Sequence, residues 1–274
     1  MVTEKTCREN IVQLRFYGEL NDFLPGVKKK TWFTHVVKGN PSIKDTIESL
    51  GMPHTEIGRI LVNPVRDFTI SNGVNHTAVD FSYQIRPGDK IKICPIDKNI
   101  LKKEILLRPR LPRRPTFILD SHLGKLARYL RLFGFDTLYK RDYSDQDIVQ
   151  TVKMGNRIVL TRDVGLLKNK IIRHGYWIRE IHPKKQIKEV IKRFNLRLPI
   201  QSFRICLECN GKIVRIKKNK IIHRLPPKTK DYFNKFHMCL KCKKIYWQGS
   251  HYEKLSDFIR KIKKQTLKGR TQNK

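Results

Sequence analysis

The chain has 274 residues, of which 59 are Lys or Arg and 24 are Asp or Glu, so its formal net charge at neutral pH is +35. Hydrophobic residues make up 39% of the sequence and aromatic residues 9%, which excludes a wholly disordered chain. The sequence has neither an apolar run long enough to span a membrane nor an apolar signal segment at its start. Length and charge predict a cytoplasmic protein of two or three domains that binds a polyanion, most simply nucleic acid, and has no membrane partner.

Residues 1–97 have the pattern of a small α+β domain. Alternating or β-rich runs predict strands over residues 10–17, 31–37, 57–62, 79–85 and 90–94. Between the second and third runs, Ser42 is placed to cap a helix whose apolar face holds Ile43, Ile47 and Leu50. Two strands, a helix and further strands predict a sheet of about ubiquitin size.

Three runs in this region carry a resemblance: PHTEI at 53–57, ILVN at 60–63 and PGDKIKICP at 87–95. They resemble the β-grasp, ubiquitin-like family that includes the small subunit of molybdopterin synthase and the thiamine sulfur carrier. The sulfur carriers act through a free Gly-Gly terminus, whereas this chain continues past Pro95, and residues 64–77 look like an insertion between two strands. The resemblance therefore implies a β-grasp fold with a binding or scaffolding role, such as recruiting a protein partner, rather than sulfur transfer.

Residues 98–115 hold seven basic residues, one acid and three prolines. Because proline cannot occupy a helix interior, this segment is predicted to be a linker between domains. It is either a solvated tether or a basic arm that contacts RNA phosphates, and the sequence leaves both interpretations open.

From residue 116 to residue 200, strands alternate with helices. Short apolar runs predict strands over residues 117–120, 137–139, 157–160 and 176–179. Periodic apolar faces predict helices over residues 123–133 and 145–154, a short helix after residue 163, and a helix that begins at Pro183. This alternation predicts an open α/β domain with a parallel sheet.

Three aspartates fall where ligands bind in such a sheet, at the carboxyl ends of its strands. Asp120 ends the first strand, Asp163 follows the third, and Asp145 opens the helix between them. Carboxylates gathered at one edge repel one another unless a divalent cation neutralises them, so these residues are candidate ligands of a catalytic Mg²⁺ or Mn²⁺. For Asp145 an ordinary helix N-cap is the alternative interpretation.

Basic side chains accompany these acids. Lys125, Arg128 and Arg131 recur at a spacing of three residues opposite the apolar face of the first helix, and Arg162 directly precedes the third acid. We expect these four side chains to contact RNA phosphates, and an ordinary solvated helix face is the alternative for the first three.

Four of the six cysteines form two Cys-x-x-Cys pairs, Cys206 with Cys209 and Cys239 with Cys242. Two such pairs supply the four thiolates that Zn²⁺ prefers, and a closed site of this kind predicts a structural role. We therefore predict a zinc ribbon over residues 201–262, followed by a basic, disordered tail over residues 263–274. The remaining cysteines, Cys7 and Cys94, are expected to be small buried or incidental residues.

Aromatic residues follow the second cysteine pair. They are Tyr246, Trp247 and Tyr252, which lie among lysines, and His251 directly precedes Tyr252. Stacking aromatics among basic residues are typical of single-stranded RNA recognition. A place in the small core is the alternative for Trp247, and His251 is either a contact to the scissile phosphate or a structural residue.

Longer runs carry a second resemblance. They are FILD, LGKLARYLR, GFDT, SDQDI and RIVLTRD, followed by CLECNG, LPP and CLKCKKIYWQGSHY. These runs resemble the Mut-seven C-terminal family of PIN-like ribonucleases, which often carries the same ubiquitin-like domain. The resemblance covers nearly the whole chain and implies a PIN-like fold with metal-dependent ribonuclease activity. The acids that match the family pattern are Asp120, Asp145 and Asp163, with Asp147 as a further candidate, while Asp136 is expected to be structural.

The predicted organisation is thus a β-grasp domain, a basic linker, a PIN-like α/β domain over residues 116–200 and a small zinc ribbon. The predicted reaction is hydrolysis of RNA phosphodiester bonds at the aspartate cluster. Two alternatives remain open: a non-catalytic RNA-binding adaptor, and a protein that recruits a partner through its β-grasp domain. DNA is a further alternative for the substrate.

Overall fold

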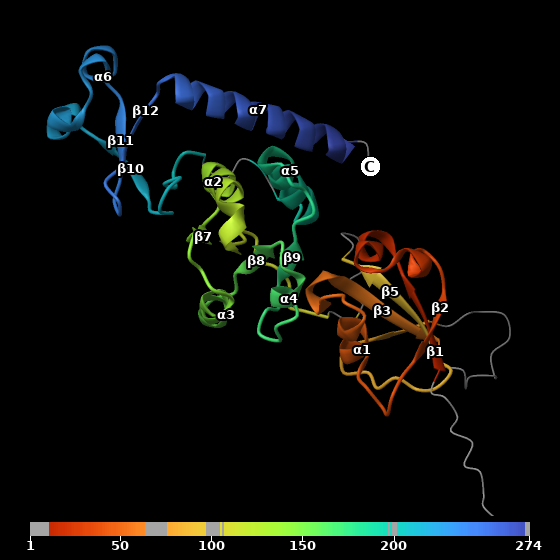
Figure 1. Ribbon diagram of the computed structural model, residues 1–274. Coiled ribbons are helices and arrows are strands. Elements are labelled where there is room, and N and C mark those ends of the chain that lie inside the picture. The colour runs from red at the N-terminus through yellow and green to blue at the C-terminus, as the bar shows by residue number, and fades with distance from the viewer. Residues whose placement is uncertain are drawn as a thin grey trace, which may run out of the picture. The chain divides into compact units, whose positions relative to one another are not determined.

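The computed structural model describes residues 11–63, 76–96, 105, 107–196, 198 and 202–271, of which residues 266–271 are described without their side chains. Cys7, most of the 64–77 insertion and part of the 98–115 segment lie outside the described residues. Figure 1 shows the helices and strands, coloured from red at the N-terminus to blue at the C-terminus. The chain divides into two compact units. The first unit comprises Met1–Leu111 and Asp163–Trp177, and the second comprises Pro112–Arg162 and Ile178–Lys274.

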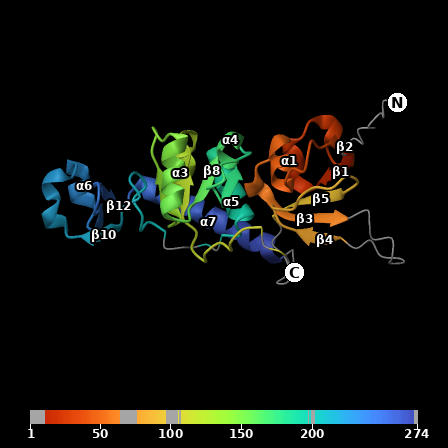
Figure 2. The ribbon, with the colours of Figure 1, turned by 90° about the horizontal axis from the view of Figure 1, so that it is seen from below.

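The first unit contains a mixed five-stranded sheet in the order β2-β1-β5-β3-β4. Its strands are β1 (Ile11–Phe16), β2 (Phe33–Val36), β3 (Ile57–Asn63), β4 (Thr77–Val79) and β5 (Lys90–Pro95). β1 and β5 are parallel, and the other neighbours are antiparallel. The helix α1 (Ile43–Ser49) packs on this sheet (Figure 2), and the short 3₁₀ helices are η1 (Gly18–Phe23), η2 (Gly26–Lys28) and η3 (His54–Glu56). This arrangement confirms the predicted β-grasp fold.

The helix α1 begins where the sequence predicts. The side chain of Ser42 accepts a hydrogen bond of 3.1 Å from the backbone N–H of Asp45, which satisfies one of the unpaired donors of the first turn. Ile43 and Ile47 are fully buried in the core of this unit. Burying each such side chain contributes about 1.5–3 kcal/mol, so the apolar face is what holds this short helix on the sheet.

The strand predicted over residues 79–85 is wrong, because β4 ends at Val79. The carboxylate of Asp80 accepts hydrogen bonds from the backbone N–H and the hydroxyl of Ser82, at 2.8 and 2.5 Å. A side chain that bonds to the backbone two residues on offers the chain a turn in place of a strand ladder. This local bonding outweighs the apolar alternation on which the strand prediction rested.

The first unit also contains a segment that the sequence assigns to the α/β domain. This segment includes α4 (Val164–Leu167) and β9 (Gly175–Trp177). Two residues of η3 bind it: Nε2 of His54 lies 3.0 Å from the carbonyl oxygen of Ile172, and the buried carboxylate of Glu56 accepts a hydrogen bond of 2.7 Å from the backbone N–H of Trp177. The β-grasp region therefore binds residues 163–177 of its own chain.

Acidification is expected to destabilise the first unit through the buried His174. Burial, and after it the positive charges of Arg108 and Arg173, lowers the pKa of this imidazole to about 4. The unfolded chain, with a histidine pKa of about 6.5, therefore binds the proton more readily than the folded protein. The stability that depends on neutral His174 is complete above pH 6.5 and is lost as the pH falls from about 6.5 toward 4, with an upper bound of about 3 kcal/mol.

Urea unfolding at pH 7 and pH 5 measures this effect. His174→Gln, which cannot titrate, should lose less stability than the wild type between the two pH values. An equal loss in both proteins would show that other groups cause the acid sensitivity.

The second unit contains the predicted parallel α/β sheet. Its strands β7 (Thr137–Tyr139), β6 (Phe117–Leu119) and β8 (Ile158–Thr161) are parallel neighbours in that order. Its helices are η4 (Ser121–Leu123), α2 (Gly124–Leu132), α3 (Asp145–Met154) and α5 (Pro183–Arg193). β6 and β8 are buried along their whole length, as expected for parallel strands covered on both faces. The sheet confirms the predicted α/β fold class.

A small antiparallel sheet completes this unit. Its strands are β10 (Ile213–Ile216), β11 (Phe236–Cys239) and β12 (Ile245–Trp247), and the helical elements are η5 (Lys218–Lys220), η6 (Ile222–Arg224), α6 (Pro227–Tyr232) and α7 (Ser250–Thr271). The prediction of a disordered tail from residue 263 is wrong as far as Thr271. Buried Ile259 and Ile262 continue the helical period, and the ring of Phe258 packs 4.8 Å from that of Tyr129. Among the described residues, no helix is both long enough and apolar enough to cross a membrane.

Candidate functional site

Asp120 lies at the carboxyl end of β6, where the sequence places it. Its Oδ1 accepts hydrogen bonds from the backbone N–H and the hydroxyl of Ser121, at 2.5 and 3.0 Å. Its Oδ2 accepts a bond of 2.9 Å from the hydroxyl of Thr161, the buried last residue of β8. The carboxylate is therefore fixed across the ends of two adjacent parallel strands, the position at which α/β sheets bind ligands.

Asp145 and Asp147 lie in the first turn of α3. The N-cap of this helix is Ser144, so the interpretation of Asp145 as a simple N-cap is wrong. Asp147 completes a capping box: its Oδ2 accepts hydrogen bonds from the backbone N–H of Ser144 at 3.0 Å and from its hydroxyl at 2.7 Å. These bonds lower the pKa of Asp147, and they give its carboxylate a local structural role.

Asp163 is the first residue of the segment that belongs to the first unit. It is exposed and caps α4, with its Oδ1 accepting a hydrogen bond of 2.7 Å from the backbone N–H of Gly165. The four cysteines, discussed below, are the one group of three or more potential metal ligands that lies close together in the described part of the chain. The metal-binding role of the aspartates therefore stays a prediction.

Asp136 is held in a structural network, in agreement with the sequence-based expectation. It forms a two-pronged ion pair with Arg157, with both distances 2.9 Å, and it accepts a hydrogen bond of 2.7 Å from the side chain of Asn210. Burial raises the pKa of this carboxyl, but the bonds from Arg157 and Asn210 outweigh it, so the pKa of Asp136 is lowered. Asn210 also accepts from the backbone N–H of Thr137 at 2.9 Å, so it ties the ribbon to β7. The Asn-Gly pair after the first Cys-x-x-Cys was the only sequence signal for this residue.

The basic residues of α2 divide into two groups. Lys125 and Arg128 are exposed, as a phosphate contact requires, and so is Arg162. The prediction for Arg131 is wrong, because its side chain is only 2% exposed. Its guanidinium donates hydrogen bonds to the carbonyl oxygens of Thr137, Leu207 and Glu208, at 3.0, 3.0 and 2.7 Å. Arg131 therefore links α2 to the first cysteine knuckle and is not available to RNA.

Replacing Arg131 by methionine is expected to lower the free energy of unfolding by about 3–5 kcal/mol, because one buried and two partly buried carbonyl groups lose a charged donor. Arg128→Met, which removes an exposed guanidinium paired with Glu208 at 3.3 Å, should cost less than about 1 kcal/mol. Chemical denaturation of the two variants measures the difference. Equal losses would contradict the structural role assigned to Arg131.

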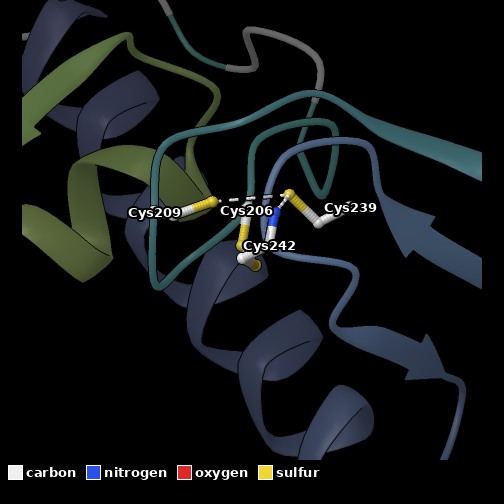
Figure 3. Close-up of side chains that lie close together, drawn as sticks. All are labelled: Cys206, Cys209, Cys239 and Cys242. Atoms are coloured by element: carbon white, nitrogen blue, oxygen red, sulfur yellow. Dashed lines mark hydrogen bonds between the residues drawn. The ribbon is translucent and has the colours of Figure 1, made fainter.

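The four cysteines face one another in two matching knuckles (Figure 3). Their sulfur atoms all lie within 4.8 Å of one another, with 3.6 Å between Cys206 and Cys242 and 3.4 Å between Cys209 and Cys239. Tetrahedral Zn–S bonds of about 2.3 Å would place the sulfur atoms about 3.8 Å apart, so the set fits one ion of this kind. The predicted residues therefore form a group that could bind a metal.

The backbone of each knuckle follows the same pattern. Cys206 N–H donates to the carbonyl of Gly211 at 2.7 Å, and Cys239 N–H donates to that of Lys244 at 2.9 Å. Asn210 and Lys243, each directly after the second cysteine of a pair, have positive φ angles of 64° and 59°. A Cβ atom on Gly211 would lie 2.9 Å from the sulfur of Cys239, so the first knuckle requires glycine there.

A neighbouring tyrosine acts on one of these sulfur atoms. The hydroxyl of Tyr246 lies 3.0 Å from Sγ of Cys206. Burial raises the pKa of this thiol, but hydrogen bonds from Tyr246 and from the backbone of Cys209 and Glu208 outweigh it and lower the pKa of Cys206 to about 7. The thiolate form, which is the form that binds metal, is therefore favoured at this position. Trp247 packs against the buried Phe236, as its alternative interpretation predicted.

Comparison with protein-family models gives two matches. The model of the Mut7-C RNAse domain matches residues 115–259, and the model of the Mut7-C ubiquitin domain matches residues 9–101. Comparison with curated proteins and with solved structures gives no match. Because the first model covers more than half of the chain and both resemblances agree with the observed folds, the protein belongs to the Mut7-C RNAse domain family, with a Mut7-C ubiquitin domain at its N-terminal end.

Proposed function

We propose that the protein is a divalent-metal-dependent ribonuclease that hydrolyses RNA phosphodiester bonds at the carboxyl edge of its parallel sheet. The observation that carries this proposal is the match of residues 115–259 to a ribonuclease domain, combined with the fixed position of Asp120 at the ends of β6 and β8. The net charge of +35 supports a polyanionic substrate.

Asp120, Asp145 and Asp163 are the proposed ligands of Mg²⁺ or Mn²⁺. Carboxylate oxygens suit these hard cations, and Oδ2 of Asp120, which accepts one hydrogen bond, from Thr161, retains a further lone pair. Asp163 follows Thr161 by only two residues, so covalent geometry keeps its backbone within about 7 Å of the end of β8. When bound, the metal polarises the scissile phosphate and activates the attacking water.

Basic residues hold the substrate in this proposal, and the cysteines hold a second metal. Lys125, Arg128 and Arg162, all exposed, bind backbone phosphates and offset the negative charge that develops during hydrolysis. The four cysteines hold a structural Zn²⁺, because a site with four protein ligands leaves no position for water or substrate. The two metals therefore have separate places and separate roles.

Thr161 is proposed to orient the catalytic carboxylate. Thr161→Val keeps the shape of the side chain and removes the hydroxyl that donates to Asp120, so the cleavage rate should fall by about 10- to 100-fold, while RNA affinity stays unchanged. Thr151→Val is the matched control, because the exposed Thr151 hydroxyl donates to the carbonyl oxygen of Asp147 within α3, at 2.7 Å. Single-turnover rates and binding constants test this, and equal rates for the two variants would contradict it.

Cleavage of a labelled RNA by the full chain tests the proposed function. The zinc-loaded protein is freed of Mg²⁺ and Mn²⁺ by dialysis, and each metal is then restored separately. We expect cleavage only after Mg²⁺ or Mn²⁺ is restored. Tight binding without cleavage under every metal condition, with several RNAs and a DNA, would favour the alternative of a non-catalytic RNA-binding adaptor.

A further inference from the structure

A large cleft lies within the second unit, apart from the proposed catalytic acids. Its volume is about 1560 Å³, and α2, the chain from Ser202 to Arg215, and the start of α7 line it. Neither Asp120 nor Asp145 contributes to its walls. Pockets for small molecules commonly measure about 300–1,000 Å³, so the size fits a segment of a polymer better than a single metabolite.

The charge of the cleft selects an anionic ligand. Eight Lys or Arg side chains line it, against two acids, Asp136 and Glu208. Both acids are already paired: Asp136 with Arg157, and Glu208 with Lys244 at 2.8 Å and Arg128 at 3.3 Å. The basic side chains of the cleft therefore outnumber its two acids, whose negative charges are already paired, so the cleft carries a net positive charge.

Aromatic faces distinguish this cleft from a simple phosphate surface. The rings of Phe203 and Tyr252 lie with their centroids 4.4 Å apart and their planes tilted by 33°, and both residues are only partly buried. Tyr129 and Tyr246 also line the cleft. Nucleic-acid bases expose their faces for stacking on aromatic side chains only when they are unpaired, so this combination fits a single strand and not a duplex.

The backbone at Phe203 gives a second, independent indication. Phe203 has a φ angle of 64°, in the left-handed region that bulky residues rarely adopt. Such a conformation persists only where the surroundings fix it, and here the Phe203 N–H bonds to the carbonyl of Leu132 in α2 at 3.4 Å. The strain places a large aromatic ring on the wall of the cleft.

The cleft also approaches the proposed catalytic edge along α2. Lys125 lines the cleft from the first turn of this helix, and Asp120 precedes the helix by four residues. Leu132, at the other end of α2, lies about 10 Å further along at 1.5 Å per residue. One helix therefore forms both the wall of the cleft and the approach to the acids.

We propose that this cleft binds single-stranded RNA, with phosphates on its basic side chains and bases on the Phe203–Tyr252 pair, and that it delivers the strand to Asp120. This inference rests on the proposed function for the identity of the substrate as RNA. It deepens that function because it extends the substrate contacts of Lys125 and Arg128 to a whole cleft and selects unpaired strands.

Fluorescence anisotropy with the full-length, zinc-loaded Asp120→Asn protein, without Mg²⁺ or Mn²⁺, tests binding separately from cleavage. The probes are a labelled single-stranded 12-mer RNA, a DNA of the same sequence and a blunt RNA duplex. We expect the single-stranded RNA to bind at least about 10-fold more tightly than the duplex and no more weakly than the DNA. Tighter binding of the duplex or the DNA would overturn the proposal.

Variants locate the site. In the Asp120→Asn background, Tyr252→Leu should weaken binding of the single strand by about 5- to 100-fold. The aromatic control is Tyr232→Leu, since Tyr232 lies outside the cleft on α6 and is 78% exposed. Equal effects of the two changes would overturn the proposal. Zinc content and circular dichroism verify the fold of each variant.

A charge variant gives a second readout should Tyr252→Leu fail to fold. Lys212→Gln with Arg215→Gln should lower the slope of log affinity against log salt by about 1.4, because each lost phosphate contact on a single strand changes it by about 0.7. Lys220→Gln with Lys235→Gln, two exposed lysines outside the cleft, is the charge-matched control. Equal slopes for the two variants, or displacement of the RNA by an equal charge of polyglutamate, would overturn the proposal.

This design separates the two claims. Selective single-strand binding that depends on Tyr252, in a protein whose wild type cuts no RNA, would support the cleft and reject the nuclease. Cleavage that depends on Asp120 but is unchanged by the cleft variants would support the nuclease and reject the cleft as its RNA-binding site.

Discussion

Replacing Cys239 by serine is expected to abolish binding of the proposed zinc ion and to unfold the small antiparallel sheet of the second unit. Cys239 is fully buried, lies 3.4 Å from Cys209 through their sulfur atoms, and ends β11. The buried cores of this sheet are small: one comprises Cys206, Ile213 and Cys239 itself, and the other comprises Ile221, Leu225 and Phe236. Structural zinc contributes about 10–16 kcal/mol in isolated zinc-finger peptides at neutral pH, far more than such a core can supply.

Zinc content and thermal unfolding measure this effect, with Cys94→Ser as the matched control. Cys94 lies on β5 of the first unit, far from the cysteine knuckles in the sequence, and should leave the zinc content unchanged. Removing zinc from the wild type with a chelator should reproduce the behaviour of Cys239→Ser. A variant that keeps one zinc per chain and its full thermal stability would show that the four-cysteine group is not a structural metal site.

Replacing Asp120 by asparagine is expected to lower the cleavage rate by about 10³-fold. The change keeps the size of the side chain and removes the charge that the proposed divalent metal requires, and such a metal contributes several kcal/mol to transition-state stabilisation. The amide of the Asp120→Asn side chain can still accept a hydrogen bond from Ser121 or Thr161 through its carbonyl oxygen, so the fold should survive.

Asp231→Asn is the charge-matched control for this variant. Asp231 is an exposed aspartate on α6, outside the parallel sheet, and its loss also raises the net charge of the protein by one. Its cleavage rate should equal that of the wild type. A similar fall in both variants would mean that total charge, and not the carboxylate at the sheet edge, controls the rate.

Local patterns in the sequence predicted much of the fold. The boundaries of β7 and α3 were predicted correctly, because a short apolar run and a regular helical period are local signals. The spacing of the two cysteine pairs correctly predicted that the four sulfur atoms lie close together, since each Cys-x-x-Cys segment forms its own knuckle. Asp120 was placed correctly because a buried parallel strand leaves the residue that directly follows it at the ligand-binding edge.

Two of the errors came from contacts between residues distant in the sequence. The spacing of Arg131 with Lys125 and Arg128 indicated a solvated face, but its hydrogen-bond acceptors, Leu207 and Glu208, lie 76 and 77 residues further along the chain. The binding of residues 163–177 by His54 and Glu56 spans 118 and 121 residues. No pattern within a single segment contains these pairings.

The placement of residues 163–177 bears on the role of the β-grasp domain. The segment begins with Asp163, one of the proposed metal ligands, and η3 of the β-grasp region holds it through His54 and Glu56. The ubiquitin-like region thus binds a segment of its own chain through η3. Recruitment of a protein partner by this region stays a prediction.

The measurement that tests the central claim most directly is the single-turnover cleavage rate of a labelled RNA as a function of Mn²⁺ concentration. Wild type, Asp120→Asn and Asp231→Asn are compared at equal zinc content. We predict a saturable rise in rate for wild type and Asp231→Asn, and a rate about 10³-fold lower for Asp120→Asn at every concentration. Cleavage that needs no added metal, or that is equal in all three proteins, would contradict the assignment of a metal-dependent nuclease site at Asp120.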